Sequence, residues 1–440
     1  MPSFSIRNFG CRVNQAEAFA WAEAFRTGGL WLEDDPARSD LVVVNSCTLT
    51  ARADRDVRRF LEKISRENPA AKIVVTGCGA GEALARAGTP PGVVLVVPNV
   101  EKDGLPGKVL ALARRGEARK MAEGGTDAAP AERGPGGDFF RARALLKIQD
   151  GCDNRCAFCV IPSVRGRSVS VGEKTVLARA RDLVAAGYRE LVLAGIHLSS
   201  YGADLGPGHS LAGLLERVER IEGIGRIRLS SLDPRRTDGA LAARIAGNPR
   251  FCQHFHLSLQ HASERILKDM GRPGGADAAA ALLADLRRRS PDAALGAYVI
   301  AGFPGETEDD FRRLEEFLRD SPLTYWHAFP YSPRSGTPAA ARPQVPDAVK
   351  SRRAVALRRL SAGKNLRFRQ SFEGRELAAV VIRAAGSPGR GDGAAEVLTG
   401  NYIRAFVAGC PAPRRQIVRV HIVRALPRST EAAFVGGFIK

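Results

Sequence analysis

Three cysteines, Cys152, Cys156 and Cys159, lie directly after the β-prone run 142–148. Their offsets of four and three residues allow a single loop to present three thiolates to one centre. A structural zinc site requires four ligands, and no further Cys or His follows at a spacing typical of a zinc finger. A 4Fe-4S cluster held by only three thiolates leaves one iron open to another ligand. The motif therefore indicates such a cluster on a loop at a strand end.

The region around this motif alternates β-prone runs with helical runs. Strand followed by helix, repeated at this spacing, is typical of a (β/α) barrel whose functional loops lie at the carboxyl ends of the strands. We therefore expect a partial (β/α)6 barrel over residues 141–365. Its six strands are expected within 142–148, 190–195, 226–231, 254–259, 296–302 and 324–329.

The first segment, residues 1–115, has the same rhythm and predicts a parallel α/β domain. Its β-prone runs are 3–9, 41–45 and 72–76. A cysteine follows each run. Because parallel strands end at one edge of a sheet, these cysteines can converge although they are far apart in sequence. They are Cys11, Cys47 and Cys78.

The remaining segments have a different character. Residues 116–140 are rich in Gly, Ala, Pro and charged side chains, which is typical of a linker. Residues 368–440 contain β-prone stretches divided by Gly and Pro turns, with no convincing helix. A small antiparallel β-barrel is expected there, and its basic residues favour nucleic acid as a partner.

The charge of the chain points to a polyanionic partner. Lys and Arg number 66 against 47 Asp and Glu, a net charge of +19. Residues 351–440 hold 17 basic and 5 acidic residues, so 12 of these charges lie there. Such an excess suits phosphate neutralisation, although a generally basic surface from a GC-rich genome is the alternative. Eight cysteines are too few for a disulfide scaffold. With no apolar run of membrane-spanning length and no secretory signal, we expect a cytoplasmic protein without a membrane partner.

The Cys-x3-Cys-x2-Cys motif after the first barrel strand resembles that of the radical S-adenosylmethionine enzymes. The whole chain resembles one branch, the methylthiotransferases, which combine an N-terminal α/β domain, a radical barrel and a C-terminal nucleic-acid-binding barrel called TRAM. In this family Cys11, Cys47 and Cys78 match three ligands of a second cluster. The matching stretches are 9–17, 42–50, 74–80, 301–311, 329–340 and 398–407, besides the cysteine motif.

Three short stretches are similar to the branch that acts on N6-threonylcarbamoyladenosine in tRNA. They are GCRVNQAE from Gly10, LAGIHLSSYGADL from Leu193 and RIRLSSLDP from Arg226. The branch acting on isopentenyladenosine usually has Gln-Met-Asn after the first cysteine, and the branch acting on an aspartate of a ribosomal protein has Pro-Lys-Asn. Both remain alternatives. An alternative of another class is a non-catalytic, metal-containing RNA-binding protein.

The resemblance implies conversion of the modified adenosine next to the anticodon to its 2-methylthio derivative. It also implies two 4Fe-4S clusters and S-adenosylmethionine, which serves both as methyl donor and as radical source. The expected partners are the anticodon stem-loop of tRNA, a reductant such as flavodoxin or ferredoxin, and a sulfur donor. We expect a monomer.

Other residues are candidates for contact with S-adenosylmethionine. Phe158 precedes the last cysteine of the motif and offers a ring that can pack on a purine. The other candidates are Ser230, at the end of a strand, and the turn residues Gly302, Gly305 and Glu306. Arg165 and Arg167 are read either as contacts to cofactor or RNA phosphate or as a solvated pair.

Two places depart from the family pattern, and two cysteines lie outside it. Gln260-His261-Ala262 stands where Gln-Ser-Gly is usual, and Tyr298 stands where an acidic residue is common. Both places are expected near the barrel mouth, where contacts to cofactor or substrate are made. Cys252 and Cys410 match no ligand pattern, and we interpret them as buried thiols.

Overall fold

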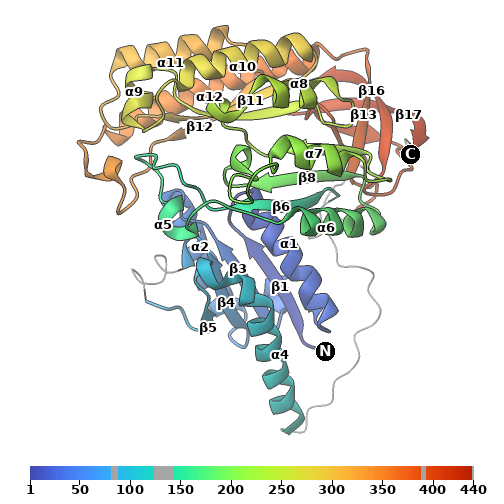
Figure 1. Cartoon of the computed structure of the whole chain (residues 1–440). Helices are drawn as coiled ribbons and strands as arrows, with labels where there is room; N and C mark the ends of the chain where they lie inside the picture. The colour runs from blue at the N-terminus through green and yellow to red at the C-terminus, as the bar shows by residue number, and fades with distance from the viewer. Residues whose placement is uncertain (81–87, 123–141, 388–392, 439–440) are drawn as a thin grey trace.

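The computed structural model describes residues 1–80, 88–122, 142–387 and 393–438, with side chains given for all of these except 116–122 and 438. Three parts follow one another along the chain: an α/β domain, a partial barrel and a small closed barrel (Figure 1). The expected linker, 116–140, begins inside a helix that ends at Ala122, and the rest of it lies outside the described residues.

The N-terminal domain is a five-stranded parallel sheet with strand order β2-β1-β3-β4-β5. Apolar residues on both faces of the central strand explain why helices cover both sides. Val42 and Val44 pack against α2, whereas Leu41 and Val43 face the core that contains α1. The elements are β1 (Ser3–Asn8), α1 (Arg12–Thr27), β2 (Trp31–Leu32), β3 (Leu41–Ser46), α2 (Ala51–Glu67), β4 (Lys72–Gly77), β5 (Val93–Val96) and α4 (Leu105–Ala122).

The central part contains the six parallel strands expected from the sequence. Strands β6, β8 and β9 form one sheet and β10, β11 and β12 another. Parallel bridges from Ile227 to Phe251 and from Leu232 to Leu257 join the two sheets into one curved wall. The strands are β6 (Ala144–Asp150), β8 (Glu190–Gly195), β9 (Arg226–Leu229), β10 (His254–Gln260), β11 (Ala294–Ala301) and β12 (Tyr325–Pro330), with the short β7 (Val169–Ser170) antiparallel to β6.

Helices cover the outer face of this wall (Figure 1). Alternate strand residues such as Leu257 and Val299 are buried in the same apolar core as helical residues such as Leu283 and Leu314, as the two-residue period of a strand requires. The helices are α5 (Ile161–Arg165), α6 (Glu173–Ala185), α7 (Leu211–Glu219), α8 (Gly239–Gly247), α9 (Glu264–Asp269), α10 (Gly275–Arg289), α11 (Glu308–Asp320) and α12 (Asp347–Gln370).

Helix α1 of the N-terminal domain occupies part of the inner face of the wall. Ala16 on α1 is buried with Leu145 of β6 and Val192 of β8, both of which point away from the outer helices. The N-terminal domain therefore closes the side of the partial barrel next to β6 and β8. The inner face of β9 to β12 is lined instead by polar and ring-bearing side chains.

The C-terminal part is a closed five-stranded barrel with order β13-β14-β15-β17-β16. The expectation of an antiparallel barrel holds for four pairings, whereas β15 pairs parallel to β17. The parallel pairing arises because β16 crosses over before β17 returns beside β15. The strands are β13 (Glu376–Arg383), β14 (Ala395–Thr399), β15 (Arg404–Ala408), β16 (Ile417–Ala425) and β17 (Thr430–Phe438).

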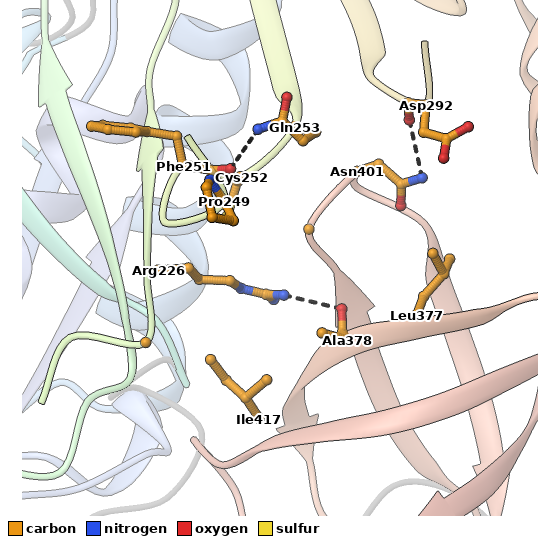
Figure 2. A pocket seen from close by; sticks show the side chains of 12 residues that line it. Arg226, Pro249, Phe251, Cys252, Gln253, Asp292, Leu377, Ala378, Asn401 and Ile417 are labelled. Carbon is orange, nitrogen blue, oxygen red and sulfur yellow. Dashed lines mark hydrogen bonds between the residues drawn. The ribbon is translucent and has the colours of Figure 1, made fainter. Parts of the chain in front are cut away.

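Two buried arginines attach this barrel to the central wall. Arg226 donates to the Leu398 and Ala378 carbonyls at 2.7 and 3.2 Å, and Arg228 donates to the Thr399 carbonyl at 3.1 Å. Beside them lies a pocket of about 300 Å³, where Figure 2 shows Arg226 reaching Ala378 and Asn401 reaching Asp292.

Glu190 provides the counter-charge for both arginines. Its side chain is fully buried and lies 2.7 Å from Arg226 and 2.7 Å from Arg228. Burial alone would raise the pKa of Glu190, but Arg226, Arg228 and Arg143 together hold it well below its ordinary value. The two buried arginines that attach the C-terminal barrel therefore share one carboxylate.

We predict that Glu190→Gln lowers the free energy of unfolding by about 3 kcal/mol at neutral pH, because it leaves buried guanidinium groups without a counter-charge. Because the pKa of Glu190 is lowered in the folded protein, its charge stabilises the fold at pH values above the ordinary pKa of a glutamate. This contribution is lost as the pH falls from that ordinary pKa through the pKa of the folded state. The deficit of the variant should therefore shrink below about pH 4. Thermal unfolding from neutral to acidic pH measures it. Glu216→Gln, which disrupts solvent-accessible pairs with Arg220 and Arg244, should cost less than about 1 kcal/mol.

Candidate functional site

The three strand-end cysteines of the N-terminal domain converge as the sequence predicts. Cys11, Cys47 and Cys78 follow β1, β3 and β4, which are neighbours in the sheet. Burial first, and then the neighbouring thiols of Cys11 and Cys78, raise the pKa of Cys47, and Cys11 also contributes to the raised pKa of Cys78, as is expected of thiols that lie close together. Gly77 makes this convergence possible, because its φ is +94° and a Cβ there would lie 2.4 Å from the Ser46 carbonyl.

Cys152, Cys156 and Cys159 form a second group on the loop between β6 and α5. The loop is held by backbone hydrogen bonds from Ala157 to Met270 and from Cys159 to Cys156, both of 3.0 Å. Gly151 starts the loop at a φ of +65°, where a Cβ would lie 1.8 Å from the Arg167 carbonyl. This close approach admits only glycine.

The chemistry of both groups fits iron–sulfur ligation. All six thiols are free of disulfides. Backbone N–H groups of Asn154 and Ile161 donate to Cys152 and Cys159 at 3.4 and 3.5 Å, the kind of contact that stabilises cluster thiolates. Burial, together with the neighbouring thiols, raises the pKa of Cys47 and of Cys159 to about 12, so a bound metal would be needed to ionise them.

Within the residues that the structure describes, no three His, Cys, Asp or Glu side chains are placed to hold one metal ion.

One arginine joins the two cysteine groups. Arg165, on α5 just past the second group, donates to the Cys78 thiol at 3.0 Å and to the Asn14 side chain at 2.8 Å. It also donates to Glu17 at 3.0 Å and to Asp150 at 2.7 Å. Its side chain is fully buried, whereas that of Arg167 is 92% exposed. Of these two arginines, only Arg167 is therefore a solvated side chain.

Two lysines complete this buried charge network. Lys102 lies 2.5 Å from Glu17 and 2.9 Å from Asp150, and Lys147 lies 3.3 and 3.1 Å from the same carboxylates. Burial alone would raise the pKa of Glu17, but Arg165, Lys102 and Lys147 lower it below its ordinary value. Three cations thus face two carboxylates beside the thiol of Cys78.

The sequence interpretation missed Glu17, Asn14 and Arg12. A usable signal was present, since Asn14 and Glu17 follow Cys11 at three-residue steps and so share a face of α1.

Two of the side chains expected to contact the cofactor make contacts within the protein. Phe158 packs against the apolar group that includes Phe303 and Tyr331, and the Ser230 hydroxyl accepts from the Gly195 amide at 3.3 Å.

The turn after β11 is organised by its own glutamate. Glu306 accepts from the backbone N–H groups of Gly302 and Phe303 at 2.7 and 3.2 Å and pairs with Arg353 at 2.7 Å. His261, which differs from the usual family residue at this position, is fully buried and lies 3.4 Å from Glu306. Gly302 lies against Lys350, whereas Gly305 faces open space. The Glu306 carboxylate is thus engaged within the protein.

Comparison with known proteins agrees with this geometry. Residues 146–318 match the family described as "Radical SAM superfamily", and residues 3–97 match "Uncharacterized protein family UPF0004". A Bacillus subtilis protein, threonylcarbamoyladenosine tRNA methylthiotransferase MtaB, is 32% identical over 99% of this chain and 97% of its own length. The chain belongs to the radical S-adenosylmethionine methylthiotransferase family. Membership implies a 4Fe-4S cluster and S-adenosylmethionine.

Other relatives show how the methylthiotransferases divide. Three further proteins with the same MtaB name match at 32 to 34% identity. A Paracoccus denitrificans protein, tRNA-2-methylthio-N(6)-dimethylallyladenosine synthase, is 33% identical over 96% of this chain and 95% of its own. Overall identity therefore does not separate the branches of this methylthiotransferase family.

Solved structures support the fold alone. The radical S-adenosylmethionine methyltransferase TsrM of Kitasatospora setae aligns with a TM-score of 0.52 and 16% identity, covering 77% of this methylthiotransferase and 75% of TsrM. No helix in the described part of the chain has the length and apolar character needed to cross a membrane.

We predict that Arg165→Gln lowers the free energy of unfolding by about 3 to 5 kcal/mol, because it leaves Glu17 and Asp150 buried with fewer partners. Chemical denaturation of the purified protein measures this. Arg167→Gln is the matched control, since its exposed pair with Asp153 spans 3.5 Å and is worth less than about 1 kcal/mol. Equal effects of the two substitutions would contradict a central role for Arg165.

Proposed function

We propose that the protein converts N6-threonylcarbamoyladenosine next to the anticodon of tRNA to its 2-methylthio derivative. The observation that carries this proposal is the convergence of two cysteine groups linked by Arg165, in a chain that matches relatives of that name over nearly its whole length. The stretches GCRVNQAE, LAGIHLSSYGADL and RIRLSSLDP favour this branch.

The alternatives have less support. Isopentenyladenosine as substrate is favoured by overall identity as strongly as the proposed one, but the three branch-specific stretches oppose it. Action on a ribosomal protein, the activity named for a Moorella thermoacetica relative, fits poorly with a basic C-terminal segment. A non-catalytic RNA-binding protein is disfavoured by membership of an enzyme family.

We assign one 4Fe-4S cluster to Cys152, Cys156 and Cys159 and a second to Cys11, Cys47 and Cys78. S-adenosylmethionine held at the first cluster would supply both the radical needed to remove hydrogen from an adenine carbon and the methyl group. A radical is required because an aromatic C–H bond offers no acidic proton to a general base. The proposed contacts to this cofactor are Phe158, Ser230, Gly302, Gly305 and Glu306.

The chain itself orients these groups. Arg272 approaches the Cys156 sulfur at 3.8 Å and is fixed by Asp233 at 3.1 Å, so a positive charge lies beside the proposed cluster. On the N-terminal side Arg165 places its charge against Cys78. Hydrogen bonds and cations at cluster sulfurs stabilise the reduced state.

The remaining parts of the proposal concern partners. We assign residues 1–115 to the domain of the second cluster, 141–365 to the radical barrel and 368–440 to a TRAM-like RNA-binding barrel. The protein would act in the cytoplasm as a monomer on the anticodon stem-loop, without a membrane. A flavodoxin- or ferredoxin-like reductant and a sulfur donor would serve it.

We predict that replacing Cys152, Cys156 or Cys159 with Ala abolishes 5′-deoxyadenosine formation. Replacing Cys11, Cys47 and Cys78 together should lower the iron content from about eight to about four per chain and stop methylthiolation. Cleavage of S-adenosylmethionine should persist in that triple variant. Iron analysis and mass spectrometry of nucleosides from the reacted stem-loop measure both effects.

The buried thiols outside the two groups provide the control for these variants. Cys252 and Cys410 are both buried, as expected, and Cys252 lines the pocket of Figure 2. Cys410→Ala should keep full iron and activity. An unchanged iron content in the triple variant would refute the second cluster, and methylthiolation of isopentenyladenosine but not of threonylcarbamoyladenosine would refute the proposed substrate.

We also predict that the double variant Arg424→Gln/Arg428→Gln binds tRNA more weakly. Both side chains are exposed on the C-terminal barrel, and loss of two phosphate contacts should reduce the slope of log affinity against log salt by about 2. Formation of 5′-deoxyadenosine without RNA should not change. Affinities measured at several salt concentrations decide, and an unchanged slope would place the RNA contacts elsewhere.

A further inference from the structure

The inner face of the barrel wall carries a group of rings in mutual contact, here called the ring cluster. Tyr402 of the C-terminal barrel stacks on His254 with centroids 4.0 Å apart, and His256 lies 4.1 Å from Tyr298. The side chains of His254, His256 and Tyr298 alternate along β10 and β11 with residues of the outer core. The ring cluster consists of His254, His256, Tyr298, Tyr325, His327 and Tyr402.

Arg12 approaches the ring cluster from the N-terminal domain. It is the first residue of α1 and directly follows Cys11. Its guanidinium donates to the Leu229 carbonyl and to the Tyr402 hydroxyl, each at 3.4 Å, and lies 5.9 Å from the Tyr402 ring. All these partners are neutral. Among the residues that the structure describes, no carboxylate pairs with Arg12.

The inner face has an excess of positive charge. Arg143, Arg226 and Arg228 share the single carboxylate of Glu190, at distances of 3.7, 2.7 and 2.7 Å. Arg12 therefore adds a fourth cation against one anion. Burial lowers the pKa of His254 and His256, and Arg12 lowers both further, so these imidazoles stay neutral and the excess charge comes from the arginines.

The ring cluster also offers polar atoms for a ligand. His256 is 3% exposed and its Nε2 has no hydrogen-bond partner, and the same holds for Nδ1 of His254 at 1% exposure. Burying an imidazole nitrogen without a partner costs stability unless a bound group satisfies it. The face thus presents an unpaired cation together with unsatisfied hydrogen-bonding atoms, which suits an anionic, polar ligand.

We infer that Arg12 binds the carboxylate of the threonylcarbamoyl group and so selects this adenosine over one with an apolar substituent. The inference rests on the proposed function, whose substrate ends in a threonine carboxylate, whereas an isopentenyl group has no charge. A guanidinium pairs with a carboxylate through two parallel hydrogen bonds. Arg12 is half-buried, and an apolar substituent would leave this partly desolvated cation without a counter-charge, which provides rejection as well as attraction.

The test compares two RNA stem-loops, one with N6-threonylcarbamoyladenosine and one with the threonine carboxylate replaced by the neutral carboxamide. The wild-type protein should prefer the carboxylate in kcat/KM of methylthiolation. Arg12→Gln should lose roughly 10- to 100-fold on the carboxylate RNA, as expected for a charged hydrogen bond, but less than about 3-fold on the carboxamide RNA. Arg12→Lys should retain part of the preference. Iron content and 5′-deoxyadenosine formation without RNA should stay at wild-type values.

Arg26→Gln is the matched control, because it removes the same charge from the exposed end of the same helix; it should behave as wild type on both RNAs. An equal loss of Arg12→Gln on both RNAs, or an unchanged preference, would overturn the inference and leave the proposed function intact. No methylthiolation of the carboxylate RNA by wild-type protein would overturn the proposed function itself.

Discussion

The guanidinium of Arg165 holds the two halves of the site in register. It reaches from the loop of one cysteine group to the thiol of the other, and it is buried with two carboxylates and two lysines. A charge buried in this way tolerates little displacement, because its desolvation is offset only while every partner stays in place. The distance between the two proposed clusters therefore depends on this network more than on the apolar contacts around it.

All three parts of the chain contribute to the inner face of the barrel wall. Helix α1 covers β6 and β8, the wall itself supplies the histidines and tyrosines, and Tyr402 of the C-terminal barrel stacks on His254. Arg228 connects the wall to the C-terminal barrel, since it binds the Thr399 carbonyl and lies 5.1 Å from the Tyr402 ring. The C-terminal barrel thus helps to form this inner face in addition to any contact with RNA.

Short-range patterns predicted the elements, and long-range contacts escaped them. Apolar runs such as 41–45 and 190–195 mark buried parallel strands, so the strand ends and their cysteines followed from the sequence. The burial of Arg165 depends on partners such as Glu17, more than a hundred residues away in the sequence. The stacking of Tyr402 on His254 depends on the interface between two parts of the chain. The parallel pairing of β15 with β17 was likewise missed, because strand order leaves no local mark in a β-prone sequence.

The basic side chains near the C-terminus have two separate roles, structural and RNA-binding. A count of Lys and Arg in the sequence does not distinguish them. Arg369 donates to Ser429 and Thr430, Arg415 lies over the Tyr188 ring at 4.0 Å, and Arg375 pairs with Asp292. These arginines hold the barrel together or attach it to the wall. Only exposed side chains such as Arg424 and Arg428 stay available to phosphate. Since buried and paired cations release few counterions on binding, the salt dependence of tRNA affinity should reflect a handful of contacts rather than the full excess of 12 charges over residues 351–440, part of which lies on α12.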